Sequence, residues 1–277
     1  MFMTNSASTP VPPVQDEGEQ TIHQATTFRS EVLAVRAYLE SAFAGLDSAL
    51  RHFVRKDLAA AEPFPLAVVI LSAGLPEQDS ADVCQQRIFL AAALEMLRIA
   101  LSIHEDLVIS GAPGQAEKSL VGATILVGDY CFSHSASLAA RTDSPYVVEI
   151  FSNALKAVSE GRLRSLFSDS DLAGGQGGEA YGGQEELCVA GARAAVHLAD
   201  IPPGETKKLI VAAATVGKTL DLGEDPANLY ERIGKESFPP HQQMRWHQAL
   251  TYLAEGSVVE NAPPLSPDTR YVNGSGG

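Results

Sequence analysis

The longest apolar segment of the chain, residues 83–109, constrains the fold more than any other part of the sequence. Its centre, "IFLAAALEMLRIAL", is apolar on all sides of a helix. Such a helix lies in the middle of a bundle, because other helices must cover each of its faces. The segment ends in "IHEDLVISG", where Glu105 and Asp106 follow His104. These acids indicate a metal site, a damaged metal site or a solvated helix end.

Helical periodicity continues through most of the chain, and no alternating strand pattern competes with it. The segments that read as helices are 28–58, 118–141, 144–167, 185–201, 203–223 and 239–256. Ser144 and Pro145 fit the N-cap and the first turn of the third of these helices. The apolar stretch 64–75 can be a strand or a helix, because its length suits a strand and Pro65 suits a first helical turn. We expect an all-α protein of roughly eight to ten helices. A single domain would span residues 21–260, between disordered tails at 1–20 and 261–277.

Charge and cysteine content narrow the classes of function. The net charge of −14 argues against nucleic acid as a partner, because phosphate neutralisation requires a basic surface. The three cysteines, Cys84, Cys131 and Cys188, form no CxxC pair, so we expect buried thiols in a reducing compartment. We see no secretory signal and no apolar run of about 18 residues or more. A cytoplasmic protein without an integral membrane segment is therefore expected.

Several segments, taken in order, resemble the motifs of one enzyme family. "TILVGDYCFSHSASLAA", which begins at Thr124, looks like the family helix "ILAGDYLFAxA". "AAALEMLRIALSIHEDL", which begins at Ala91, looks like "AAAIELLHTASLIHDDxxD", and "GKESFP", which begins at Gly234, resembles "GKxTLP". On these motifs, residues 91–239 resemble the trans-polyprenyl diphosphate synthase (polyprenyl synthetase) family.

This resemblance implies an isoprenoid-synthase-type helical bundle around a central cavity. Active members of the family condense an allylic diphosphate with isopentenyl diphosphate, and two DDxxD motifs on facing helices hold Mg²⁺. The metal suits this chemistry because hard divalent cations bind carboxylate oxygens and stabilise the charge of the leaving diphosphate. The resemblance also implies a prenyl diphosphate or isoprenoid ligand, and a homodimer or a heterodimer with an active prenyl synthase.

Both aspartate-rich motifs are degenerate in this chain. The aligned residues are Glu105, Asp106 and Ile109 in the first motif and Glu224, Asp225 and Asn228 in the second. The candidate Mg²⁺ ligands are therefore Glu105, Asp106, Glu224 and Asp225. Each pair also has a structural interpretation. Glu105 and Asp106 can mark a helix end in solvent, and Asp225 can cap a new helix after a stop at Gly223.

The resemblance assigns three further residues to the substrate cavity: Glu95, Asp129 and Tyr130. Glu95 can also form an ion pair with Arg98, three residues along the same helix. Asp129 also fits a buried polar position that stabilises helix packing. His104 fits a core histidine better than a metal ligand.

The basic residues of the family's diphosphate site are missing here. "GKRxRP" corresponds to "AAEPFP" at 60–65, the paired arginines after the first motif correspond to "GAPGQ" at 111–115, and "KT" corresponds to Leu187 and Cys188. Each lost charge-assisted contact costs about 1.5–3 kcal/mol. We therefore expect a noncatalytic or regulatory subunit of a prenyltransferase, or an isoprenoid-binding protein. The alternatives are an active Mg²⁺-dependent prenyltransferase that uses Glu-Asp pairs in place of DDxxD, and a purely structural helical protein.

Overall fold

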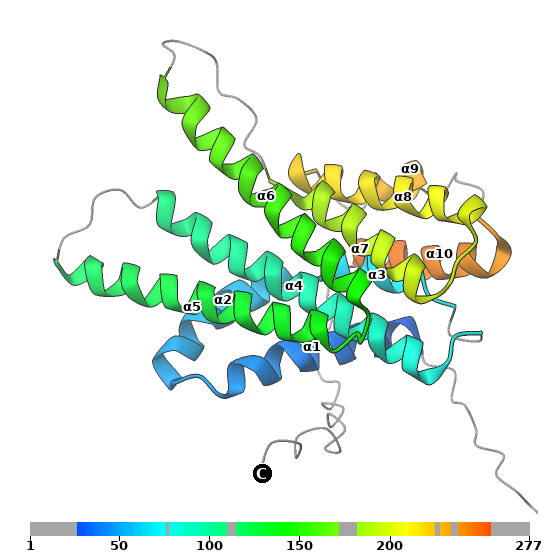
Figure 1. Cartoon of the computed structure of the whole chain (residues 1–277), viewed down its shortest axis with the longest axis horizontal. Helices are drawn as coiled ribbons and strands as arrows, with labels where there is room; N and C mark the ends of the chain where they lie inside the picture. The colour runs from blue at the N-terminus through cyan, green and yellow to red at the C-terminus, as the bar shows by residue number, and fades with distance from the viewer. Residues whose placement is uncertain are drawn as a thin grey trace, which may run out of the picture.

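The computed structural model confirms the all-α prediction, and it describes residues 27–75, 78–109, 115–171, 182–224, 228–233 and 238–255 (Figure 1). Within these residues the helices are α1 (Phe28–Ala44), α2 (Ser48–Ala61), α3 (Pro65–Ser72), α4 (Ala81–Ile109), α5 (Gln115–Ala140), α6 (Pro145–Asp171), α7 (Gln184–Leu198), α8 (Pro203–Asp221), α9 (Leu229–Ile233) and α10 (Pro240–Glu255). The two proposed tails lie outside the described residues. The domain boundaries at 20 and 260 therefore stay predictions.

Helix α4 lies in the middle of the bundle, as its apolar sequence predicts. It packs against α1, α2, α3, α5 and α7, and the residues from Leu90 to Leu94 at its centre are almost completely buried. Helix α7 packs against both α4 and α8. In Figure 1, α4 and α8 both run toward the left of the view, and the two motif remnants lie at the C-terminal end of α4 and just after α8.

The stretch 64–75, which could be a strand or a helix, contains the helix α3, and every residue of this helix is buried. Pro65 occupies the first turn, where its missing N–H costs nothing. The preceding Phe64 has a left-handed conformation, with φ 56°, and gives no side-chain cap. A buried helix start still needs acceptors for its free N–H groups. Glu95 of α4 supplies one, because its Oε1 accepts the N–H of Ala67 at 3.0 Å.

The amphipathic stretch 28–58 is two helices instead of one continuous helix. Helix α1 ends at Ala44 with Gly45 as its C-cap, and α2 begins at Ser48. The N–H of Leu46 donates back to the carbonyl of Phe43 at 3.1 Å and closes the last turn of α1. The three-to-four periodicity persists across this break, which is why the sequence pattern did not reveal it. The turn lets α2 fold back against α1.

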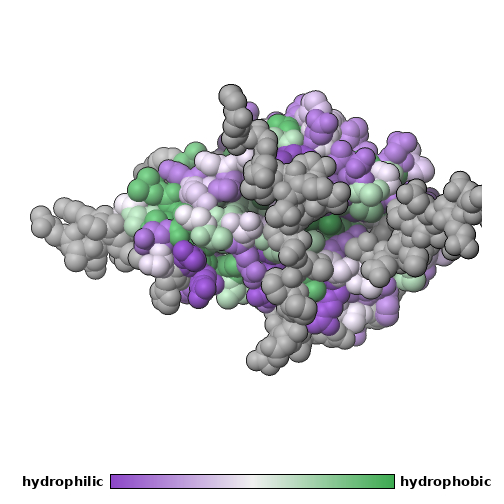
Figure 2. All heavy atoms as spheres, turned by 90° about the horizontal axis from the view of Figure 1, so that it is seen from below, coloured by the Kyte–Doolittle hydropathy of each residue, from purple (hydrophilic) through white to green (hydrophobic). Residues whose placement is uncertain are grey.

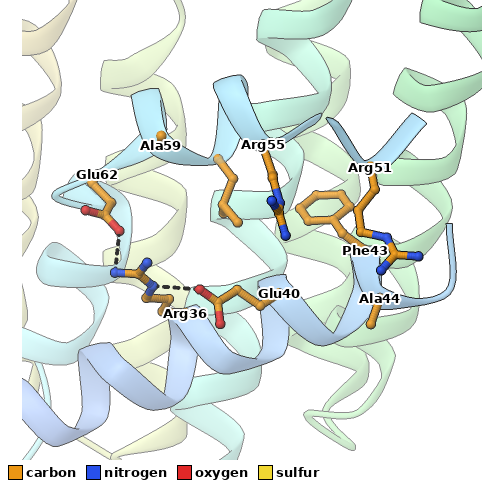
Figure 3. A pocket seen from close by; sticks show the side chains of 9 residues that line it. Arg36, Glu40, Phe43, Ala44, Arg51, Arg55, Ala59 and Glu62 are labelled. Carbon is orange, nitrogen blue, oxygen red and sulfur yellow. Dashed lines mark hydrogen bonds and ion pairs between the residues drawn. The ribbon is translucent and has the colours of Figure 1, made fainter. Parts of the chain in front are cut away.

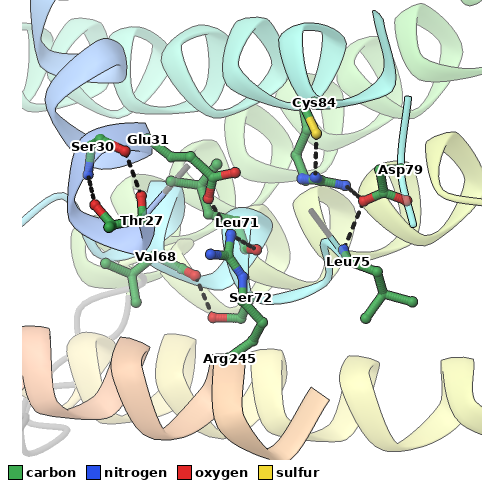
Figure 4. A network of polar contacts seen from close by, with 11 residues as sticks. Thr27, Ser30, Glu31, Val68, Leu71, Ser72, Leu75, Asp79, Cys84 and Arg245 are labelled. Carbon is green, nitrogen blue, oxygen red and sulfur yellow. Dashed lines mark hydrogen bonds and ion pairs between the residues drawn. The ribbon is translucent and has the colours of Figure 1, made fainter. Parts of the chain in front are cut away.

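Charged side chains in the core pair across different elements of the fold (Figure 4). Arg245 of α10 pairs with Glu31 of α1 and donates to the carbonyl of Leu71 in α3 at 2.9 Å. Arg87 of α4 is fully buried and pairs with Asp79 at 2.8 Å. Buried charges are tolerated when they are paired and hydrogen-bonded. The contacts of Arg245 therefore join α1, α3 and α10, and the contact of Arg87 joins α4 to the segment that precedes it.

The surface mixes hydrophilic and hydrophobic residues. Figure 2 shows this mixture on the face seen from below, with hydrophobic residues gathered toward the left end of the view. Large apolar side chains are exposed on α5 and α6, among them Ile125, Leu126 and Leu163. None of the described helices is both long and apolar enough to cross a membrane.

Candidate functional site

The first motif remnant lies at the C-terminal end of α4. Glu105 is half exposed, and its Oε2 lies 3.2 Å from Nη2 of Arg162 in α6. The other terminal nitrogen of Arg162 donates to the carbonyl of Leu101 at 2.8 Å. Arg162 therefore neutralises Glu105 and also satisfies a carbonyl near the end of α4. The backbone of Asp106 is helical, but its side chain and that of Ile109 lie outside what the structure describes.

The second motif remnant follows α8, which stops at the predicted glycine. Gly223 has φ 62°, and the N–H groups of Gly223 and Glu224 donate to the carbonyls of Leu220 and Thr219 at 3.0 Å each. These two bonds form a Schellman motif, for which a left-handed glycine is the usual residue. The predicted helix end is confirmed. The predicted N-cap, Asp225, lies outside the described residues.

Glu224 carries its own counter-ion, as Glu105 does. Its Oε2 lies 2.9 Å from Nη1 of Arg232 in α9, and the same nitrogen is 3.0 Å from Thr219 Oγ1. Both ionic side chains of this pair are about two-fifths exposed, at 42% and 41%. Sequence reasoning missed both arginines, although Arg232 lies only eight residues after Glu224.

Asp221, in the last turn of α8, caps the start of α7. Its Oδ1 accepts the N–H of Gln184 at 2.9 Å and its Oδ2 accepts the N–H of Glu185 at 3.0 Å. Helix α7 needs this acceptor because Gly183, its own N-cap, has no side chain to provide one. The sequence carried a signal for this role, since a glycine pair before a helix predicts that the cap comes from elsewhere.

Glu95 lies deep in the bundle. Its side chain is completely buried, and its Oε2 lies 2.8 Å from Nε of Arg98, which confirms the expected ion pair. Arg98 also donates to the carbonyl of Ala61 at 2.6 Å, while the other Glu95 oxygen caps α3. Both carboxylate oxygens of Glu95 therefore already have partners within the protein. A role for Glu95 beside a substrate stays a prediction.

Asp129 and Tyr130 point to different sides of α5. The Asp129 side chain is 63% exposed, so the expectation of a buried polar position was wrong. The register of α5 explains this result. Gly128 faces His104 of α4, and a Cβ built on it would lie 2.4 Å from His104 Nε2. With Gly128 against α4, the next residue points to solvent, and Asp129 Oδ1 lies 3.5 Å from the same nitrogen.

Tyr130 contacts α1. Its hydroxyl donates to the carbonyl of Ala42 at 2.6 Å, and its ring lies 4.4 Å from that of His134. Burial raises the pKa of the Tyr130 hydroxyl, which therefore stays protonated as a donor. His104 stacks on Phe132, with ring centroids 5.3 Å apart. These contacts are those of packing residues, and the assignment of Tyr130 to a substrate cavity stays a prediction.

The described residues do not fit a divalent metal site. Mg²⁺ takes oxygen ligands in octahedral geometry, usually from one or two carboxylates with water and phosphate. The part of the chain that the structure describes contains no group of three His, Cys, Asp or Glu side chains that could hold a metal ion. Both described motif carboxylates, Glu105 and Glu224, are instead paired with arginines. The carboxylates of Asp106 and Asp225 lie outside this comparison.

The positions that carry cations in the family have other roles here. Glu62 pairs with Arg36 at 2.7 Å, and Phe64 belongs to the core. Leu187 and Cys188 are completely buried, and burial raises the pKa of the Cys188 thiol. These positions therefore provide core packing and one acidic partner for an arginine.

Comparison with known proteins supports the fold. No family model and no curated protein sequence matches the chain. Among solved structures, it is similar to a decaprenyl diphosphate synthase from Rhodobacter capsulatus, with a TM-score of 0.55 and 19% identity over 82% of this chain and 84% of that one. It is also similar to a polyprenyl synthase from Caulobacter crescentus CB15 complexed with calcium and isoprenyl diphosphate, with a TM-score of 0.56 and 20% identity over 80% and 76%.

A third similar structure is a heptaprenyl diphosphate synthase from Staphylococcus aureus, with a TM-score of 0.51 and 16% identity over 83% of this chain and 85% of that one. In each of the three, the match covers most of both chains, so it concerns the whole bundle. The resemblance that the motifs suggested therefore extends to the arrangement of the helices. The chain has the helical-bundle fold of the polyprenyl diphosphate synthases.

Proposed function

We propose that this protein is a noncatalytic or regulatory subunit that works with an active prenyl synthase. The observation that carries the proposal is the pairing of Glu105 with Arg162 and of Glu224 with Arg232. In a class I prenyl synthase the equivalent carboxylates attract Mg²⁺, which in turn binds a diphosphate. An arginine from the same chain neutralises each of these carboxylates here, so their attraction for a cation is reduced.

The proposal also explains the loss of the basic positions. A subunit that no longer ionises an allylic diphosphate has no need for cations at 60–65 or at 187–188. These positions can then take core residues such as Phe64, Leu187 and Cys188 without loss of function. A related form of the proposal is an isoprenoid-binding protein, which keeps an apolar ligand and lacks the diphosphate chemistry.

The exposed apolar residues on α5 and α6 support a partner subunit. Leu126 is 68% exposed and Leu163 is 53% exposed. Several large apolar side chains exposed on two neighbouring helices favour a surface that another protein covers. We propose that α5 and α6 contribute to a dimer interface, either with a second copy of this chain or with an active prenyl synthase. The substitution Leu126→Glu, which introduces a charge into this apolar surface, should then lower the mass measured by light scattering.

An activity assay tests the noncatalytic proposal directly. The purified chain is incubated with Mg²⁺, isopentenyl diphosphate and an allylic diphosphate, and products are measured by mass spectrometry. We expect no elongation by the chain alone, and an altered rate or chain length when a relative with full DDxxD motifs is added. Turnover by the chain alone that disappears in Glu105→Gln and Asp106→Asn would overturn the proposal.

One observation favours the alternative, an active Mg²⁺-dependent prenyltransferase. The carboxylates of the two motif pairs are 51% and 42% exposed, and ion pairs in contact with water contribute about 0–1 kcal/mol. A divalent ion bound together with a diphosphate can therefore displace the arginines at low cost. The similar polyprenyl synthase from Caulobacter crescentus was solved with calcium and isoprenyl diphosphate, and the same ligands are the natural probes for this chain.

A further inference from the structure

A cavity of about 610 Å³ lies between α1 and α2 (Figure 3). Its main lining residues are Arg36, Glu40 and Phe43 from α1, Arg51, Arg55 and Leu58 from α2, and Glu62 from the turn that follows α2. Small-molecule sites typically measure about 300–1,000 Å³, so the cavity has the size of such a site. Its lining contains neither of the motif acids Glu105 and Glu224.

One end of this cavity is electrically balanced. Arg36 Nε lies 2.8 Å from Glu40 Oε1, and Arg36 Nη1 lies 2.7 Å from Glu62 Oε1. The hydrogen bond to Glu40 raises the pKa of the Arg36 guanidinium, and the charge of Glu62 acts in the same direction. Arg36 is therefore a permanent cation whose charge is already matched by two carboxylates.

The other end carries two arginines that form no ion pair with a described residue. Arg51 and Arg55 lie four residues apart on α2 and extend toward α1, with the ring of Phe43 nearby (Figure 3). Arg51 Nη2 donates to the carbonyl of Leu46 at 2.9 Å, but its buried Nε has no acceptor among the described residues. Arg55 makes no hydrogen bond or ion pair with another described residue. Like charges at this spacing destabilise a helix unless an anion lies between them.

We propose that this cavity binds a small organic anion, namely a phosphate or a carboxylate that carries an apolar group. A guanidinium presents paired N–H donors that match the oxygens of both groups, and Arg51 and Arg55 offer such donors side by side. Phe43 and Leu58 supply the apolar surface for the rest of the ligand. The protein as a whole carries a net charge of −14 and repels anions, so binding depends on these local arginines.

Calorimetric titration of the full chain at low ionic strength tests the site. The probes are hexyl phosphate, inorganic phosphate and hexanoate. We expect hexyl phosphate to bind more tightly than inorganic phosphate, and Arg55→Gln to weaken its binding about tenfold or more, since charge-assisted hydrogen bonds are lost. Glu40→Gln should tighten binding, because it removes a negative charge and frees Arg36. The hexanoate titration shows whether the site accepts carboxylates as well as phosphates.

Arg193→Gln is the matched control. Arg193 is exposed on α7, and its substitution removes the same charge as Arg55→Gln without touching the cavity. We expect the affinity of Arg193→Gln for hexyl phosphate to equal that of the wild type. An equal loss of affinity in Arg55→Gln and Arg193→Gln would mean that net charge alone causes binding, and it would overturn the proposal. The absence of binding to the wild type would overturn it as well. Arg51→Gln also removes the bond to Leu46, so the exposed Arg55 gives the variant that leaves folding intact.

Discussion

Acidic residues pair with arginines in two regions of this molecule, and the two regions differ in burial. In the core, the side chains of Glu31 and Arg245 are 1% and 5% exposed. At the helix ends that carry the motif remnants, the side chains of Glu105 and Arg162 are 51% and 20% exposed. Water screens the second kind of pair, whereas removing one partner of the first kind leaves a charge without solvent.

This difference separates the residues that stabilise the fold from the residues of the candidate site. The core pairs hold α1, α3 and α10 together, so their loss should destabilise the protein strongly. The pairs at the helix ends contact water, and their loss should lower the free energy of unfolding only slightly. Substitutions at the helix-end pairs should therefore leave the bundle unchanged.

The largest effect is expected from Glu31→Ala. The substitution leaves Arg245 buried without its carboxylate, which costs about 3–5 kcal/mol in the free energy of unfolding. Urea unfolding followed by circular dichroism measures it. Glu40→Ala is the matched control, because it breaks an exposed ion pair with Arg36 on the same helix and should cost no more than about 1 kcal/mol. Equal losses in the two variants would remove the distinction between the regions.

Glu95→Gln should have the next largest effect. Gln keeps an oxygen that can accept the N–H of Ala67, but it removes the charge that matches Arg98. A buried charge-assisted hydrogen bond contributes about 1.5–3 kcal/mol, and we expect a loss of that order in the free energy of unfolding. The double variant Glu95→Gln with Arg98→Met should lose less than the sum of the single substitutions. Additive losses would show that the two side chains do not interact.

Asp221→Ala should cost about 1–2 kcal/mol, the usual effect of removing an N-cap. This substitution tests the comparison between the two regions, because Asp221 lies close to the second motif remnant and yet stabilises the fold by capping α7. Hydrogen exchange gives a local readout, since the amides of Gln184 and Glu185 lose their acceptor and should exchange faster. Asp221→Asn retains one acceptor oxygen, so its stability should lie between those of the wild type and Asp221→Ala. Unchanged exchange at both amides would contradict the capping role.

The sequence predicted the features that rest on local signals. The central helix α4 follows from an apolar segment, the start of α6 follows from Ser144 and Pro145, and the end of α8 follows from Gly223. In the structure, Ser144 Oγ accepts the N–H of Val147 at 3.4 Å and Pro145 begins the helix. These signals depend on residues within one turn of each other, so the chain order alone carries them.

Features that depend on distant partners could not be predicted. The break between α1 and α2 keeps the helical period, so no spacing marks it. The exposed position of Asp129 depends on how Gly128 fits against His104. Arg162 lies 57 residues from Glu105, and nothing in the motif itself indicates that an arginine of α6 will reach it. The motif acids themselves therefore stay predicted site residues, and the arginines that pair with Glu105 and Glu224 were missed.

The smallest effect on stability, and the sharpest test of the comparison, comes from the double variant Glu105→Gln with Glu224→Gln. Both pairs are exposed, so we expect a loss of about 1 kcal/mol or less per pair. Millimolar Mg²⁺ should then shift the Tm of the wild type and the double variant equally, because arginines already neutralise the carboxylates. A Tm rise with Mg²⁺ in the wild type alone would mean that metal displaces Arg162 or Arg232, since a ligand stabilises the state that binds it. The two ion pairs would then be the metal-free state of a functional metal site. The alternative, an active Mg²⁺-dependent prenyltransferase, would replace the noncatalytic proposal.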